Sequence, residues 1–114
     1  ERCIIVPPDN GKEAAVVTRE TSLLAAFDAF SASTHAAFAA RGEALKSGWA
    51  FTDATARRTA LKTAWDTFKT SHKSARETFQ KAKQSAWQTF KEAAKTCKIS
   101  TTDEGDVETA EVSL

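Results

Sequence analysis

The sequence predicts an all-α protein: an antiparallel hairpin of two long helices with hendecad packing of the coiled-coil kind, an extended N-terminal segment and a C-terminal tail. Glycine and proline number only four and two in 114 residues, so few positions favour a turn. Apolar residues recur at helical spacing on both sides of one interior stretch that holds two glycines. We expect one domain, with the extended segment at 1–11, the hairpin at 12–98 and the tail at 99–114.

The N-terminal segment is expected to stay extended up to the first helix. Residues 3–6 are apolar and largely β-branched, and the proline pair at 7–8 keeps the preceding backbone out of the helical region. Asp9 or Asn10 is a suitable N-cap, and Glu13 is placed to support it.

The first helix is expected to end at a turn near residues 48–52. Gly42 and Gly48 bracket the interior stretch best able to reverse the chain. Thr52 or Asp53 would cap the second helix, because either side-chain oxygen can accept a hydrogen bond from a first-turn amide. The apolar face of the first helix is expected to hold Leu23, Phe27, Phe30, Phe38 and Leu45.

An eleven-residue repeat runs along the second helix and is echoed in the first. Trp65 and Trp87 lie 22 residues apart, and phenylalanines recur at spacings of 11. Eleven residues in three turns correspond to about 3.67 residues per turn, which keeps one stripe on one side of a nearly straight helix pair. Because the aromatic side chains are many for one contact, some of them, Phe30 and Phe51 included, are expected to face another molecule. The packing and assembly residues are Phe27, Phe30, Phe38, Trp49, Phe51, Trp65, Phe68, Phe79, Trp87 and Phe90.

Charge is distributed unevenly along a chain whose net charge is only +1. Residues 53–98 carry eleven cations against four acids, whereas residues 99–114 carry five acids and no cation. The acidic tail is expected to be disordered, or to pair with the basic face of its own or a neighbouring subunit. Beside that face runs a serine and threonine stripe, which is solvated surface, a contact face for a neighbouring helix, or a site of glycan attachment. The basic face consists of Lys62, Lys69, Lys73, Lys91 and Lys95.

Cys3 and Cys97 are expected to form a disulfide at the open end of the hairpin. Each lies 47 positions from a turn near residue 50, so an antiparallel hairpin brings both to the same end. Two cysteines in a secreted chain normally pair, and two free thiols or an intermolecular bridge are the alternatives.

Catalytic and metal-binding patterns are not found in the sequence. The histidines, His35 and His72, fall on different predicted helices, without the carboxylate–histidine spacing that suits zinc. No glycine-rich loop could hold a phosphate, and no serine or cysteine has a base and an orienting acid nearby in sequence. We therefore expect no enzyme activity, no cofactor and no metal. No apolar run approaches about 20 residues, so no transmembrane segment is predicted.

Several stretches of the chain carry a resemblance to known proteins. They are residues 21–26, residues 49–58, the paired Ala-Trp-x-Thr-Phe-Lys repeats at 64–69 and 86–91, and residues 94–97. Across residues 3–97 the chain resembles short, secreted, Ala/Lys-rich helical proteins encoded by bacteria of the candidate phyla radiation. The resemblance implies export, helices and a cysteine pair, and it carries over no catalytic residues. We interpret the start at Glu1, without a basic and apolar leader, as a mature chain whose signal peptide has been removed, located outside the cell or at its surface.

Two functions from different classes fit these residues. A two-helix hairpin has a small core, so surplus aromatic side chains favour an extracellular structural subunit that self-assembles into a filament, sheath or bundle at the cell surface. The alternative is a secreted module that binds nucleic acid or an anionic polymer through the basic face. We expect a homo-oligomer or polymer and place nucleic acid second, because phenylalanines and lysines lie on separate stripes.

Overall fold

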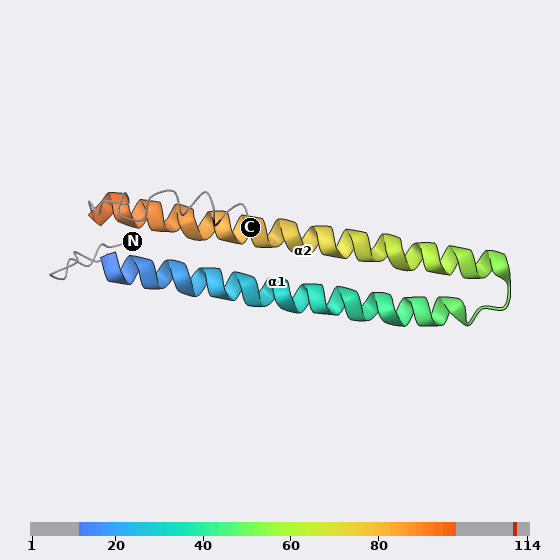
Figure 1. Ribbon diagram of the computed structural model, residues 1–114. Helices are drawn as coiled ribbons and strands as arrows, with labels where there is room; N and C mark the ends of the chain where they lie inside the picture. Colours follow the sequence, from blue (N-terminus) through green and yellow to red (C-terminus); the bar gives the residue numbers. More distant parts are fainter. Residues whose placement is uncertain (1–11, 98–110, 112–114) are drawn as a thin grey trace. The chain divides into compact units, whose positions relative to one another are not determined.

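The computed structural model describes residues 12–97 and Glu111. Helix α1 comprises Lys12–Trp49 and helix α2 comprises Ala54–Cys97. The two helices pack against each other as an antiparallel hairpin (Figure 1). The predicted all-α class and helical hairpin are therefore confirmed. The N-terminal segment, with its predicted cap and Cys3, lies outside the described residues, as does the predicted tail apart from Glu111.

The hairpin comprises two compact units. Unit 1 (Glu1–Phe27 with Phe79–Leu114) contains the first part of α1 and the last part of α2. Unit 2 (Asp28–Thr78) contains the rest of both helices and the connection between them. In each unit the two helical segments run antiparallel, because one connection reverses the chain (Figure 1). Residues far apart in the sequence thereby become neighbours within unit 1.

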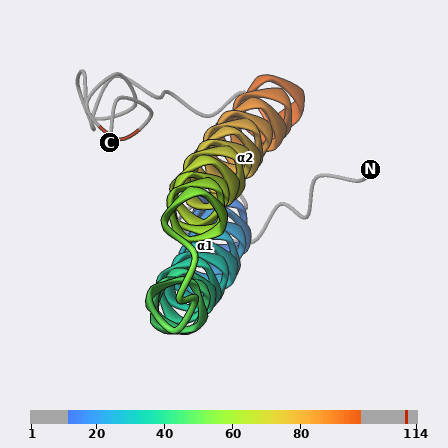
Figure 2. The ribbon, with the colours of Figure 1, turned by 90° about the vertical axis from the view of Figure 1, so that its right-hand side faces the viewer.

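A short connection, facing the viewer in Figure 2, joins the two helices. The last turn of α1 tightens as it approaches this connection. The Ala50 amide donates to the Ser47 carbonyl (3.2 Å), and the Phe51 amide donates to the Gly48 carbonyl (3.3 Å). Such bonds over three residues are of the 3₁₀ type, which frequently ends an α-helix. The reversal at residues 50–53 overlaps the turn predicted near 48–52.

Asp53 caps the start of α2. Its Oδ2 atom accepts a hydrogen bond from the Ala56 amide (2.8 Å), while its carbonyl accepts from the Arg57 amide (2.9 Å). Of the two predicted caps, Thr52 and Asp53, the structure selects the second. The Arg57 guanidinium donates to the Phe51 carbonyl (3.4 Å), which ties the connection to the first turn of α2.

Gly42 and Gly48 were expected to bracket the reversal of the chain, and the structure gives them other places. Both lie inside α1, so neither forms the reversal itself. A Cβ atom added to Gly48 would lie 3.0 Å from the Leu61 Cδ2 atom and 3.4 Å from the Ala60 Cβ atom, whereas one added to Gly42 would meet nothing within 4 Å. Gly48 therefore permits a close approach of α2, and the reversal depends on the Asp53 cap.

Small residues form the line along which the helices touch. They recur at the eleven-residue spacing, as the hendecad prediction requires. Because small side chains allow two helices to approach closely, the bulky aromatic residues lie beside this line. Small side chains also bury little apolar area, so the core of the hairpin is modest. The buried members of the line are Ala26, Ala37 and Gly48 on α1, and Ala64, Ala75 and Ala86 on α2.

Candidate assembly surfaces

A buried arginine organises the aromatic residues of unit 1. The Arg19 guanidinium lies over the Trp87 ring at 4.3 Å and over the Phe90 ring at 4.5 Å. Its Nε atom also pairs with the Glu20 carboxylate at 3.1 Å. Arg19 and both of the rings it stacks on are buried, so the cation–π attraction acts where water screens it little.

A second arginine makes the same arrangement in unit 2. The Arg41 guanidinium lies 4.6 Å from the Trp65 ring and 4.3 Å from the Phe68 ring, with Phe38 at 4.7 Å. The rings contact each other as well, since the Phe38 and Phe68 centroids are 4.9 Å apart and the Trp65 and Phe68 centroids 6.3 Å apart, both edge to face. The edge-to-face geometry is the favoured one for aromatic pairs.

The 22-residue repeat relates these two clusters. We call them the unit 1 face and the unit 2 face. Their tryptophans differ in exposure: Trp87 is 5% exposed, whereas Trp65 is 46% exposed. The unit 1 face consists of Arg19, Lys83, Trp87 and Phe90, and the unit 2 face consists of Arg41, Arg57, Trp65 and Phe68.

Lys83 is the most deeply buried side chain described, at 1% exposure. Its Nζ atom donates to the Glu111 carbonyl (3.2 Å) and lies 4.4 Å from the Phe79 ring centroid. A lysine is rarely buried without a partner. The contact therefore joins the Glu111 backbone to α2 within unit 1.

The predicted packing and assembly residues divide by exposure. Trp87 and Phe90 are buried, and Phe30, Phe68 and Phe79 are half-buried. Phe27 contacts Phe79 within unit 1, with ring centroids 6.4 Å apart. Trp49 is the most exposed of the set at 67%. The large apolar side chains that stay exposed are Val17, Leu24 and Phe27 in unit 1, and Phe38, Trp49, Phe51 and Trp65 in unit 2.

The five lysines of the predicted basic face are all exposed. Two of them lie beside carboxylates one turn further along α2: Lys62 pairs with Asp66, and Lys73 pairs with Glu77 at 4.0 Å. The hydrogen bond from Lys62 holds the pKa of the Asp66 carboxyl below its usual range. These pairs reduce the net positive field of the face.

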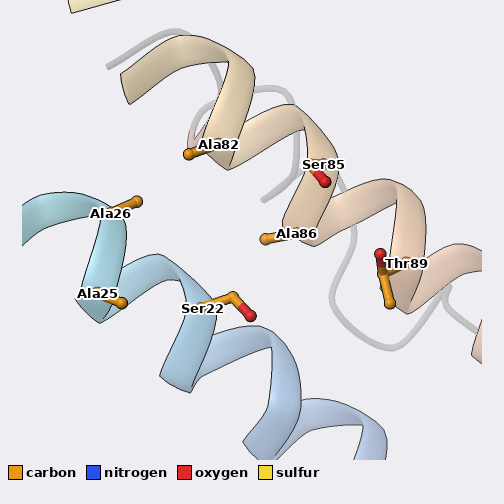
Figure 3. A pocket seen from close by; sticks show the side chains of 7 residues that line it. All are labelled: Ser22, Ala25, Ala26, Ala82, Ser85, Ala86 and Thr89. Carbon is orange, nitrogen blue, oxygen red and sulfur yellow. The ribbon is translucent and has the colours of Figure 1, made fainter. Parts of the chain in front are cut away.

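An open groove lies between the helices of unit 1. Its volume is about 420 Å³, and the side chains that line it are small (Figure 3). Two of them, Ser85 and Thr89, belong to the serine and threonine stripe of α2. None of the residues that line the groove is charged. Its lining residues are Ser22, Ala25, Ala26, Ala82, Ser85, Ala86 and Thr89.

The histidines do not come together in a site. His35 is exposed on α1, while His72 stacks on Phe68 with ring centroids 5.7 Å apart. Within residues 12–97 and Glu111, no group of three or more His, Cys, Asp or Glu side chains could hold a metal ion. Among the same residues, no helix has the length and apolarity to cross a membrane.

Comparison with models of protein families finds no match, and none is found among curated proteins or solved structures.

Four residues of the two faces were not predicted from the sequence: Arg19, Arg41, Arg57 and Lys83. Charged side chains were expected on solvated faces, and that expectation hid their contacts with aromatic rings. The signal was present, because Arg19 and Arg41 are separated by the same 22 residues as Trp65 and Trp87. A shared spacing between cations and aromatic residues on two helices predicts stacking between them.

Proposed function

We propose that the chain is an extracellular structural subunit that self-assembles at the cell surface into a filament, sheath or bundle. One observation carries the proposal: large apolar side chains remain exposed in both units after the two helices have packed. Contiguous exposed apolar area on a soluble protein usually marks a contact with another molecule. Because the helices touch along a line of small residues, some of the aromatic side chains, Phe27, Phe38 and Trp65 among them, stay exposed to a neighbouring copy.

Location outside the cell is part of the same proposal. It rests on the cysteine content of the sequence, since a pair of cysteines persists as a disulfide only in an oxidising compartment. A disulfide would also keep the ends of the hairpin together when the subunit is diluted or stretched.

Sedimentation velocity over a range of protein concentrations tests the proposal, with negative-stain electron microscopy of the concentrated sample. We expect association that grows with concentration and ordered particles larger than one chain. Leu24→Ser and Trp49→Ser should each weaken association, because each removes exposed apolar area from a different unit. Lys69→Gln is the matched control, because it changes an exposed side chain of α2 that is not one of the exposed large apolar side chains. A chain that stays monomeric at every concentration would exclude a self-assembling subunit.

Nucleic-acid or anionic-polymer binding is the second candidate. The arginines beside half-exposed rings in unit 2 favour it, because cations next to open aromatic faces can hold phosphates while bases stack. The lysine–carboxylate pairs on α2 act against it. A gel-shift titration with single-stranded DNA separates the two functions: salt-dependent retardation by a monomeric chain supports the second and contradicts the first.

A further inference from the structure

The unit 1 face and the unit 2 face share a repeated cluster of one arginine, one tryptophan and one phenylalanine, and they differ in their fourth residue. The repeat places Arg19, Trp87 and Phe90 at the positions of Arg41, Trp65 and Phe68. The distances agree closely, since arginine lies 4.3 Å from one tryptophan ring and 4.6 Å from the other. The two tryptophans nevertheless differ in exposure, at 5% for Trp87 and 46% for Trp65.

Glu111 contacts the unit 1 face through Lys83. Among the described residues, no residue from the C-terminal part of the chain makes a corresponding contact with the unit 2 face. Glu111 is half-buried, and its carbonyl oxygen accepts the hydrogen bond from Lys83. It belongs to the C-terminal segment, which we define as residues 99–114 and which carries five acids and no cation. The contact that the structure shows here is a backbone carbonyl of the acidic segment on the Lys83 ammonium, which itself lies over the Phe79 ring.

We infer that the unit 2 face binds the acidic C-terminal segment of a second copy of this chain. The inference rests on the proposed self-assembly and specifies which surfaces of two copies touch. The repeat places Leu61 where unit 1 has Lys83, and Arg57, one turn earlier on α2, supplies the cation in unit 2. Arg57 lies over the Trp49 ring at 5.8 Å, and Arg41 lies over Trp65, so two cations stand beside half-exposed rings. Opposite charges and open aromatic area together make this face complementary to the segment.

This contact has a consequence for the form of the assembly. The C-terminal segment and the unit 2 face are different surfaces, so the contact between copies is heterologous. A heterologous contact gives a ring when its rotation closes and a filament when it does not. If each chain binds its C-terminal segment to the unit 2 face of the next chain and the rotation does not close, the copies form a filament.

A labelled peptide of residues 99–114, titrated into the full-length chain and followed by fluorescence anisotropy, tests the inference. We expect saturable binding that weakens as salt is added, because the attraction is between exposed charges. Trp65→Ser should weaken binding by about tenfold, the effect of losing one central aromatic contact. His35→Ser is the matched control, since it removes an exposed ring of unit 2 that is not part of the unit 2 face, and it should leave binding unchanged. A peptide whose acids are replaced by their amides should lose binding as well.

Equal binding to the wild-type chain and to the Trp65→Ser variant, or no binding by the acidic peptide, would overturn the inference. Far-UV circular dichroism of each variant establishes that the helices are intact. Sedimentation of the same samples separates the two ideas. Association of the chain without peptide binding would support the self-assembling subunit and contradict this contact. Peptide binding by a chain that stays monomeric would support the affinity of the unit 2 face for the segment and contradict self-assembly.

Discussion

Arg19 and Arg41 make the same stacking contacts in surroundings that differ in exposure. Arg19 is buried with both of its rings, while Arg41 is half-buried beside the half-exposed Trp65. A guanidinium stacks on an aromatic face through its plane, which the compact ammonium group of lysine lacks. The strength of such a contact rises as water is excluded, from about 0.5–1 kcal/mol at exposed sites to about 2 kcal/mol when desolvated.

We therefore predict that Arg19→Lys lowers the free energy of unfolding by about 1–2 kcal/mol and Arg41→Lys by about 0.5 kcal/mol. Both substitutions keep the positive charge, so the difference reports on stacking in the two surroundings. Urea unfolding followed by circular dichroism measures it. Equal losses for the two variants would mean that burial of the tryptophan does not strengthen the stack.

At the scale of the helices, the two glycines of α1 provide a matched pair. Glycine inside a helix costs about 1 kcal/mol relative to alanine, because it loses more backbone freedom on folding. Gly42 has open space around it, so Gly42→Ala should raise the free energy of unfolding by about 0.5–1 kcal/mol. Gly48→Ala should gain less or lose stability, since its new Cβ atom meets Leu61 and Ala60.

Thermal unfolding of both single variants, compared with the unchanged chain, measures the difference between the two glycines. The methyl group added at 42 points into free space, so it serves as the control for the propensity gain alone. A gain at 48 that matched the gain at 42 would show that Leu61 moves aside freely and that α2 does not depend on close approach there.

The two helices and the turn between them could be predicted from the sequence, because patterns of neighbouring residues determine them. The eleven-residue spacing and the cap at Thr52 or Asp53 both act within a few turns, and both predictions agree with the structure, in which Asp53 is the cap. Which stripe forms the contact was harder to predict. Alanine and aromatic stripes are adjacent on α2, and only the distance between the helices decides that Ala64 and its repeats touch α1 while Trp65 stays half-exposed. The contacts of Arg19 were missed because they join residues from opposite ends of the chain.

At the scale of the whole molecule, stability depends on how the open end of the hairpin is held. The helices touch through small side chains, and two-helix cores of this kind give little net stability on their own. Within unit 1 the first part of α1 lies beside the last part of α2, which ends at Cys97 (Figure 1). Cys3 precedes the first residue of α1, Lys12, by nine positions in the sequence. An intramolecular disulfide between these cysteines thus needs only a short reach along the chain.

We predict that this disulfide forms within one chain and that reducing it lowers the free energy of unfolding by roughly 4 to 5 kcal/mol, the loop-closure value for a loop of about 95 residues. The reason is that the bridge restricts the unfolded chain, which would otherwise separate its two ends freely. Alkylation without reduction, followed by mass measurement, counts the free thiols, and urea unfolding with and without reductant measures the loss. The double variant Cys3→Ser with Cys97→Ser should match the reduced chain. A covalent dimer on a non-reducing gel would show that the disulfide joins two chains, and an unfolding midpoint that reductant leaves unchanged would show that the hairpin is held by its helices alone.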